Sequence, residues 1–170
     1  AISDVDAALD DLRATACHLG PWPTDEAGRL KAMRALRVIQ NFPREALQQL
    51  AEVAACVADT PTAFISFIDF DTYHLVAGVN IGTGVVPRFD TLCSYVITQP
   101  YETTVISDLQ TDPRFEAYRH VGEKYNYRFY VGVPILSPDG FAIGTLCAVD
   151  PKPRELTARQ LQALQHVAKS

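Results

Sequence analysis

Long apolar runs and clusters of basic residues are both missing from this sequence. No uninterrupted apolar run approaches the roughly 20 residues that a helix needs to span a bilayer. Residues 1–11 have neither the basic nor the apolar region of a signal peptide. The formal net charge is −5, and no block of Lys or Arg offers a surface to phosphate groups. We therefore expect a cytoplasmic protein that binds neither nucleic acid nor a membrane.

Closely spaced cysteines and histidines are missing as well. The four cysteines lie far apart, which disfavours a disulfide framework and metal or redox motifs. The four histidines show no metal-ligand spacing, so we expect no metal site. Cys17-His18 and His120 are residues of the kind that contact tetrapyrroles, but a helix end and a surface histidine are the more common interpretations. The cysteines are Cys17, Cys56, Cys93 and Cys147.

The composition that remains is typical of one soluble globular domain. Of the 170 residues, 48% are hydrophobic and 21% are charged, which is enough apolar material for one well-filled core. The chain starts and stops abruptly, so we expect it to be a piece of a longer protein.

Two apolar segments, at residues 128–136 and 141–150, are the strongest pattern in the chain. Ser137-Pro138-Asp139-Gly140 separates them. Proline at the second turn position and glycine, which tolerates positive φ, are typical of a tight turn, so the two segments predict a β-hairpin. Nearly every residue in them is apolar, and we therefore expect this part of the sheet to be covered on both faces.

Three helices are predicted before the first strand. The first spans residues 4–19, carries an apolar stripe at spacings of three and four, and ends at the Pro-Trp-Pro sequence of residues 21–23. The second is capped by Thr24 and runs to about Ile39. The third opens near Pro43 and has a flat apolar face that can lie close against a sheet. That face consists of Leu47, Leu50, Ala51, Ala54 and Ala58.

A second hairpin is predicted in the middle of the chain. Its strands are residues 62–68 and 73–79, both rich in β-branched and aromatic residues. A glycine-rich loop is expected to follow as far as Pro87, and a short helix is expected to begin at Asp90-Thr91. Cys93 then falls in the first turn of that helix.

The remaining segments are less regular. Residues 103–106 predict an edge strand, and residues 107–127 predict crossings over the sheet with one short helix. Thr157 and Gln160 form a capping box that starts a final helix. This helix has no C-cap signal where the chain stops, so we expect it to continue into a downstream element.

Several of these segments closely resemble the GAF domain family, in the subgroup found in bacterial sensor histidine kinases and diguanylate cyclases. The resemblance covers roughly residues 24–169. After Asp71 the chain departs from the subgroup, because Tyr73-His74-Leu75 stands where a Trp-Phe-Lys-like segment is common. The matching pieces are residues 25–30, residues 64–69, Pro87-Arg88 with Leu92-Cys93, Asp108 with residues 112–115, and residues 128–150.

The resemblance implies an α+β fold. It predicts a central antiparallel sheet of about five or six strands with helices on both faces and an extra N-terminal helix. Residues 1–23 are then an N-terminal helix and linker, and residues 24–170 are the GAF domain. A ligand pocket is implied between the sheet and the variable, helix-rich insertion that separates the two hairpins.

The resemblance also implies a regulatory function without catalysis in this domain. GAF domains mostly sense small molecules and often dimerise through their terminal helices. We therefore expect an unknown small-molecule ligand, a homodimer, and a downstream kinase or cyclase in the parent chain. We expect neither haem nor bilin, because no cysteine stands where the bilin-binding relatives carry theirs.

Two thiol hypotheses concern Cys93 and Cys147. A helix N-terminus lowers a thiol pKa, so Cys93 is either a redox or adduct-forming thiol or a small buried residue. A GAF-fold enzyme that reduces free methionine sulfoxide is an alternative, and it needs a nucleophilic and a resolving thiol. Cys56 points away from its helix's apolar face and Cys147 reads as core, which leaves only Cys93 facing the pocket.

Charged and aromatic residues complete the candidate site. Arginines around the insertion either clamp a phosphate or carboxylate ligand or form internal pairs, for instance Arg114 or Arg128 with Asp108. Aromatic side chains with polar tips suit a largely apolar pocket, or else they close the core over an empty one, as in a ligand-free dimerisation module. The candidate ligand-binding residues are Arg88, Cys93, Tyr95, Asp108, Phe115, Tyr118, Arg128 and Tyr130.

Overall fold

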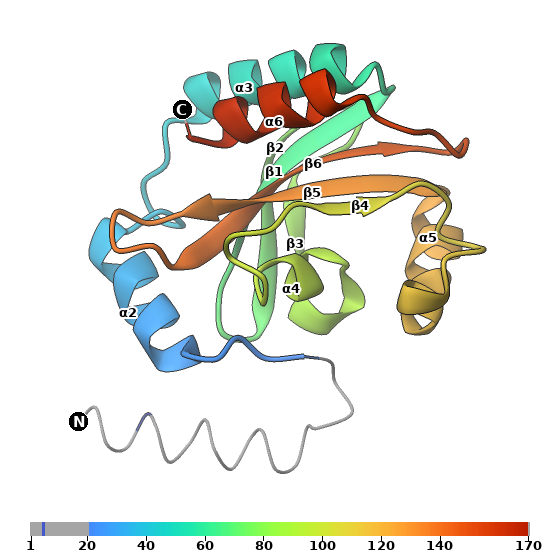
Figure 1. Cartoon of the computed structure of the whole chain (residues 1–170). Helices are drawn as coiled ribbons and strands as arrows, with labels where there is room; N and C mark the ends of the chain where they lie inside the picture. Colours follow the sequence, from blue (N-terminus) through green and yellow to red (C-terminus); the bar gives the residue numbers. More distant parts are fainter. Residues whose placement is uncertain (1–4, 6–20, 170) are drawn as a thin grey trace.

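The computed structural model describes Val5 and residues 21–169, and its centre is a six-stranded sheet with the order β3-β2-β1-β6-β5-β4 (Figure 1). All neighbouring strands are antiparallel. The expected α+β fold, with helices on both faces of the sheet, is confirmed. The strands are β1 (Thr62–Ile68), β2 (Thr72–Val79), β3 (Gly84–Pro87), β4 (Thr104–Ile106), β5 (Phe129–Leu136) and β6 (Ala142–Asp150).

The helices surround this sheet. None of those in the described part of the chain is long and apolar enough to cross a membrane. The helix expected over residues 4–19 falls, apart from Val5, outside the described residues and stays a prediction. The helices are α2 (Glu26–Leu36), α3 (Arg44–Ala58), α4 (Cys93–Val96), α5 (Arg119–Tyr125) and α6 (Ala158–Lys169), with 3-10 turns η1 (Arg88–Asp90) and η2 (Pro113–Tyr118).

The predicted hairpin of β5 and β6 is confirmed. The two strands pair from Phe129 opposite Asp150 to Leu136 opposite Ala142. Gly140 has a φ of 87° in the connecting turn, where its lack of a side chain permits a positive φ. Every residue of β6 is buried between β1 and β5, so the inference of a strand covered on both faces is also confirmed.

One face of the sheet is covered by α3 and α6, which lie side by side above it (Figure 1). The predicted small-residue face of α3 packs there, and Ala51, Ala54 and Ala58 are completely buried. Phe129 and Val131 of β5 point to this side. The capping box at the start of α6 is formed as predicted, because Thr157 and Gln160 exchange hydrogen bonds of 2.9 and 3.1 Å.

The opposite face carries α4, η2 and α5 (Figure 1). Tyr130 of β5, Phe64 of β1 and Cys147 of β6 point to this second core, as the alternation along the strands requires. The segment between β4 and β5 holds two helical elements, η2 and α5, instead of the one short helix that was predicted.

Two boundaries differ from the sequence prediction. Asp25 caps α2 in place of Thr24, since its carboxylate accepts the Gly28 amide at 2.9 Å. The helix ends at Leu36 and not near Ile39, because Arg37 adopts a left-handed φ of 52°. The glycine-rich loop before Pro87 is also wrong in part, because Gly84–Pro87 pairs with β2 as the edge strand β3.

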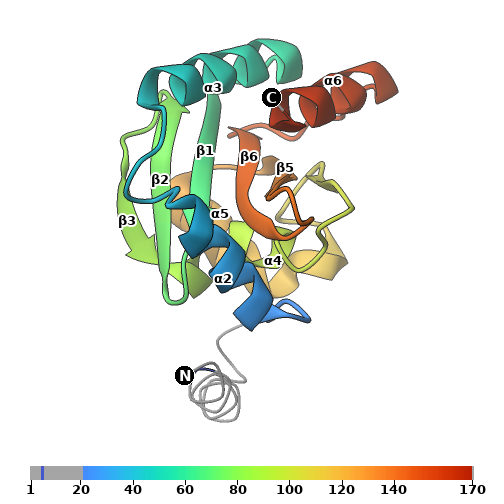
Figure 2. The ribbon, with the colours of Figure 1, turned by 90° about the vertical axis from the view of Figure 1, so that its left-hand side faces the viewer.

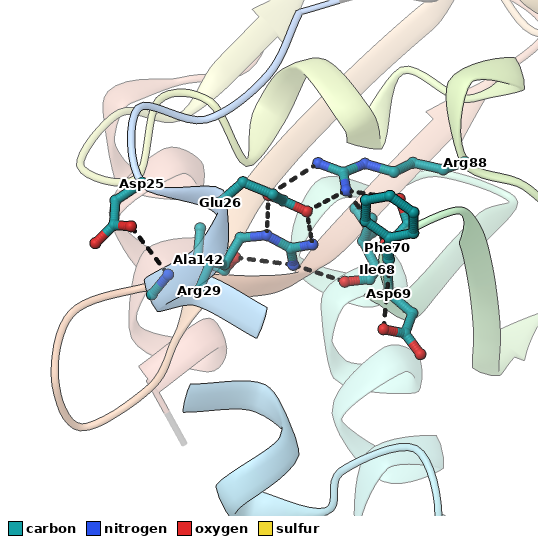
Figure 3. Close-up of polar contacts among 9 residues, drawn as sticks. Asp25, Glu26, Arg29, Ile68, Asp69, Phe70, Arg88 and Ala142 are labelled. Carbon is teal, nitrogen blue, oxygen red and sulfur yellow. Dashed lines mark hydrogen bonds and ion pairs between the residues drawn. The ribbon is translucent and has the colours of Figure 1, made fainter. Parts of the chain in front are cut away.

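Helix α2 lies at one end of the sheet, near the turn between β1 and β2 (Figure 2). A buried ion cluster joins it to the sheet there (Figure 3). The Glu26 carboxylate accepts two hydrogen bonds of 2.8 Å from Arg29 and pairs with Arg88 as well. None of the three side chains is more than 1% exposed. Burial raises the pKa of Glu26, but the hydrogen bonds and charges of the two arginines outweigh it, so the pKa lies below its usual value.

The two guanidinium groups also bind backbone carbonyls at the turn between β1 and β2. Arg29 donates to Ile68 at 2.6 Å. Arg88 donates to Asp69 and Phe70 at 3.2 and 3.1 Å. The cluster therefore holds α2, the β1–β2 turn and the segment after β3 at one place (Figure 3).

We predict that Glu26→Gln lowers the free energy of unfolding by about 3 to 5 kcal/mol, because it leaves two buried guanidinium groups without their counter-charge. Urea denaturation measures the change. Glu116→Gln is the matched control, since Glu116 pairs with Arg119 at 3.7 Å while remaining 75% exposed. That control is expected to change stability by less than about 1 kcal/mol. Equal losses in the two variants would contradict a structural role of the cluster.

Candidate functional site

A cavity of about 490 Å³ lies between the second face of the sheet and the segments around α4 and α5. This volume is within the range of small-molecule sites. The family resemblance implied a ligand pocket in this region, between the sheet and the insertion. The walls come from β1, β2 and β3, from the ends of β5 and β6, from the start of α4, and from α5. The apolar lining includes Phe64, Leu75, Val86, Leu92, Val121 and Val149.

The polar lining is uncharged. Among the described residues around the cavity there is no Asp, Glu, Lys, Arg or His. Burial raises the pKa of Tyr73, Tyr127 and Tyr130 well above the usual tyrosine value, so these phenols remain neutral. The remaining polar side-chain groups are the Cys93 thiol, the hydroxyls of Tyr125, Thr62 and Thr91, and the amides of Asn80 and Asn126. The cavity offers hydrogen bonds without ionic partners.

Of the eight candidate residues, Cys93 and Tyr130 line the cavity. Arg88 does not, because its guanidinium lies in the buried cluster with Glu26. Its position after β3 and before α4 nevertheless fixes the chain that leads to Cys93.

The aromatic candidates on the insertion form their own group beside the cavity. Tyr95 and Phe115 meet edge to face with ring centres 5.0 Å apart. The Tyr118 ring lies 6.3 Å from Tyr95 and 6.2 Å from Phe115. None of the three is a cavity residue, and they fit the alternative interpretation of aromatics that close the core.

The remaining charged candidates are paired with each other. Arg128 binds Asp108 through two hydrogen bonds of 3.1 and 2.5 Å, which lower the pKa of the Asp108 carboxyl. This is one of the internal pairs considered from the sequence. Arg114 pairs with Asp112 at 2.7 Å and not with Asp108. The Arg128–Asp108 pair ties the segment before η2 to the start of β5. Arg114 reaches the sheet through a 3.0 Å hydrogen bond to the Val105 carbonyl of β4, and both contacts lie outside the cavity.

A pair of thiols lies at the inner end of the cavity. The sulfur atoms of Cys93 and Cys147 are 3.5 Å apart, and both residues are buried. The Tyr130 hydroxyl is 3.2 Å from the first sulfur and 3.1 Å from the second. Cys147 is a core residue as expected, but its contact with Cys93 was not predicted.

Gly132 explains how Tyr130 reaches these sulfurs. Gly132 follows Tyr130 by two residues on the same face of β5 and pairs with Cys147 on β6. A Cβ atom at Gly132 would lie 2.7 Å from the Tyr130 hydroxyl. Because glycine leaves that space empty, the tyrosine folds over it and meets the neighbouring strand.

The sequence analysis missed several cavity residues. Tyr73 and Leu75 lie on one face of β2, and Asn80 and Ile81 follow that strand. The first two belong to the Tyr73-His74-Leu75 segment, where the chain departs from the subgroup that it resembles. Alternation along β2 was the one signal that placed Tyr73 and Leu75 on a common face.

Metal binding has no obvious ligands within the described residues, where no three His, Cys, Asp or Glu side chains gather around one point. Cys17 and His18 lie outside those residues. The expected absence of a metal, haem or bilin therefore stays a prediction.

Comparisons with known proteins agree with this architecture. A cyclic di-GMP phosphodiesterase of Pseudomonas aeruginosa is 29% identical over 150 residues, which are 88% of this chain and 25% of that protein. This chain therefore spans about a quarter of the length of that curated relative.

Two solved structures show the same fold. The GAF domain of Thermosynechococcus elongatus PixJ, in its blue-light absorbing form, has a TM-score of 0.61 at 15% identity, over 74% of this chain and 79% of that one. The type II free methionine-R-sulfoxide reductase of Thermoplasma acidophilum has a TM-score of 0.60 at 17% identity, over 75% of this chain and 87% of that one. At these identities the likeness concerns the fold alone.

The fold described above is therefore supported by a match at the level of sequence as well. The family model of the GAF domain matches residues 42–170, and the chain belongs to the GAF domain family.

Proposed function

We propose that this chain is the sensory GAF domain of a longer bacterial signalling protein, and that it binds a small, uncharged, largely apolar molecule in the cavity. The observation that carries the proposal is the lining: apolar side chains and neutral hydrogen-bonding groups surround about 490 Å³ of space. Transfer of apolar surface from water into this cavity drives binding. Its hydroxyl and amide groups orient the ligand.

The same lining disfavours charged ligands. A phosphate or carboxylate buried in a cavity without a cation loses its hydration and gains no ionic partner. The arginines that would serve such a ligand are engaged elsewhere, Arg88 with Glu26 and Arg128 with Asp108. A cyclic dinucleotide therefore fits this cavity poorly.

The wall formed by the end of β6 gives a route for the signal. Val149 and Pro151 line the cavity, and α6 begins seven residues later at Ala158. Between them, Arg154 bonds Asp150 at 3.2 Å and the carbonyl of Ala58, the last residue of α3, at 2.9 Å. A ligand that displaces the β6 end therefore acts on the packing of α6 against α3.

The output of this route lies in other parts of the parent protein. We propose a cytoplasmic homodimer whose terminal helices transmit the change to an effector domain. The family resemblance favours a kinase or a cyclase as the effector domain. The similarity to the Pseudomonas protein makes a cyclic di-GMP phosphodiesterase a further candidate. Neither haem nor bilin is part of this proposal.

A reductase for free methionine sulfoxide is less well supported. The contact between Cys93 and Cys147 meets the need for two thiols. The substrate, however, carries an ammonium and a carboxylate group, and the cavity lining has no charged partner for either. A ligand-free dimerisation module is the other alternative, and it predicts that the cavity binds nothing.

We predict that phenylnaphthylamine, an uncharged aromatic dye, binds this domain with a rise in fluorescence. Anilinonaphthalene sulfonate has the same ring system with one negative charge, and it is expected to bind at least ten-fold more weakly, about 1.4 kcal/mol. Equal binding of the two dyes, or no binding of either, would argue against an apolar uncharged ligand.

Two neighbouring valines of β3 locate the binding site. Val86 lines the cavity, whereas Val85 is 58% exposed. Val86→Phe places a ring in the cavity and is expected to weaken binding of the neutral dye by at least about ten-fold. Val85→Phe adds the same ring in solvent and is expected to leave binding unchanged. Unfolding temperatures of both variants verify that each is folded.

Dimerisation is tested separately. Light scattering at high protein concentration is expected to show a dimer, because the predicted stripe of the first helix needs an apolar partner. Substitution of Leu9 and Leu12 by Glu is expected to give a monomer, while Asp10→Lys, off the stripe, keeps the dimer. A monomeric wild-type chain contradicts this part of the proposal. The stripe consists of Val5, Leu9, Leu12, Ala16 and Leu19.

A further inference from the structure

We propose that Cys93 and Cys147 are a redox pair, which a hydroperoxide entering the cavity converts into a reversible disulfide. The two residues are 2% and 1% exposed, and their sulfur atoms are 3.5 Å apart. A disulfide has a bond of about 2.05 Å, so the sulfurs need to approach by about 1.5 Å.

The cavity determines which sulfur reacts first. Cys93 lines the cavity, and Cys147 lies behind it on β6 and is not a lining residue. A small peroxide in the cavity therefore meets the Cys93 sulfur before it can reach Cys147. This arrangement makes Cys93 the attacking thiol and Cys147 the resolving thiol.

The surroundings of Cys93 favour its reactive form. Burial raises the pKa of this thiol, but hydrogen bonds from neighbouring groups outweigh that effect and bring the pKa to about 6. Cys147 has the opposite tendency, since burial and the neighbouring Cys93 raise its pKa well above the usual value. The groups that favour the Cys93 thiolate are Cys147, Thr145, Tyr130 and Tyr73.

The chemistry proceeds in two steps. The Cys93 thiolate attacks one peroxide oxygen, so that an S–O bond forms, the O–O bond breaks, and the departing hydroxide or alkoxide takes up a proton. The Cys147 thiol then attacks the sulfenic sulfur of Cys93, the S–S bond forms, and the hydroxyl group leaves as water with the thiol proton. Two thiols are oxidised by two electrons, and one peroxide is reduced. Tyr130 Oη lies within 3.2 Å of both sulfurs, so it is placed to pass the thiol proton of Cys147 to the leaving hydroxyl group.

The disulfide changes the cavity wall. Cys93 is the first residue of α4, a helix of four residues, and the preceding Thr91 and Leu92 line the cavity. Drawing Cys93 toward β6 moves this wall. Oxidation of Cys93 needs the cavity as an entrance but no ligand inside it, so it is independent of ligand binding.

The test uses the full chain with Cys17 and Cys56 replaced by Ser, which leaves only the two thiols in question. The protein is treated with hydrogen peroxide and unfolded in denaturant that contains iodoacetamide, which alkylates the remaining thiols. It is then digested and analysed by mass spectrometry. We expect loss of both thiols and a linked peptide that contains Cys93 and Cys147. Dithiothreitol is expected to restore both thiols.

Single substitutions then assign the two roles. With Cys147→Ser, Cys93 is expected to stop at the sulfenic acid and to take up dimedone. With Cys93→Ser, Cys147 is expected to keep its thiol. The unsubstituted wild-type chain gives the same linked peptide, so a folding defect in a variant leaves the main result intact. Peroxide treatment that yields no linked peptide, or only higher oxidation of separate cysteines, overturns the proposal.

The pH dependence of Cys93 gives a second prediction. Because its pKa is about 6, modification by acrylamide is expected to rise with pH to half its maximum near pH 6 and to level off above it. For a free thiol the modification rate reaches half its maximum only near its pKa of about 8.5. Tyr130→Phe removes a stabilising hydroxyl and is expected to move the midpoint to higher pH. Tyr95→Phe, outside the cavity, leaves it unchanged, and a midpoint near that of a free thiol contradicts the assignment.

Discussion

The buried carboxylate of Glu26, held between two arginines, is the constraint on which the rest of the structure depends. Charges buried this deeply are tolerated only with partners and hydrogen bonds, and so the position of each is dictated by the others. Arg88 is the member that reaches the functional site. Its carbonyl accepts a 2.8 Å hydrogen bond from the Thr91 hydroxyl, and the Thr91 carbonyl accepts one of 2.7 Å from Ser94. The cluster at one end of the sheet thereby fixes α4 and the wall that presents Cys93.

The pairing of buried and half-buried charges also explains why the cavity lining is neutral. Among the described arginines that the sequence offered to a ligand, each has a carboxylate partner of its own: Arg88 with Glu26, Arg114 with Asp112, and Arg128 with Asp108. The first of these pairs fastens α2, and the third fastens the segment before η2 to the start of β5. What remains to face the cavity is aromatic, aliphatic, or polar without charge. The absence of charge from the cavity lining therefore follows from how the domain is held together.

Local patterns were sufficient for most of the fold. The two hairpins, the apolar face of α3 and the capping box at Thr157 each depend on neighbouring residues, and each was predicted. The cap of α2 was misplaced by one residue because Thr24 and Asp25 both suit that role. The pairing of Glu26 with Arg88 joins positions 62 residues apart, and no local rule reports such a contact.

The thiol pair was hidden for a similar reason. Cys147 reads as a buried strand residue, which it is, and its reactivity depends on what the fold brings to it. Strand register determines the neighbours of Cys147. It pairs with Gly132, whose missing side chain leaves room for Tyr130. Helix α4, held in place by the ion cluster, brings Cys93 to the same point. Strand alternation predicts only the face of each residue.

The proposed ligand site and the proposed redox pair share one wall, and this has a thermodynamic consequence. If the Cys93–Cys147 disulfide changes the affinity of the cavity for a ligand by some factor, the ligand changes the stability of the disulfide by the same factor. A ligand over Cys93 also blocks the path of the peroxide, so it slows oxidation even where that factor is one. The two effects are separable, because the first alters the equilibrium and the second only the rate. The two proposed inputs, oxidation and ligand binding, would thus both act on the residues between Arg88 and Cys93.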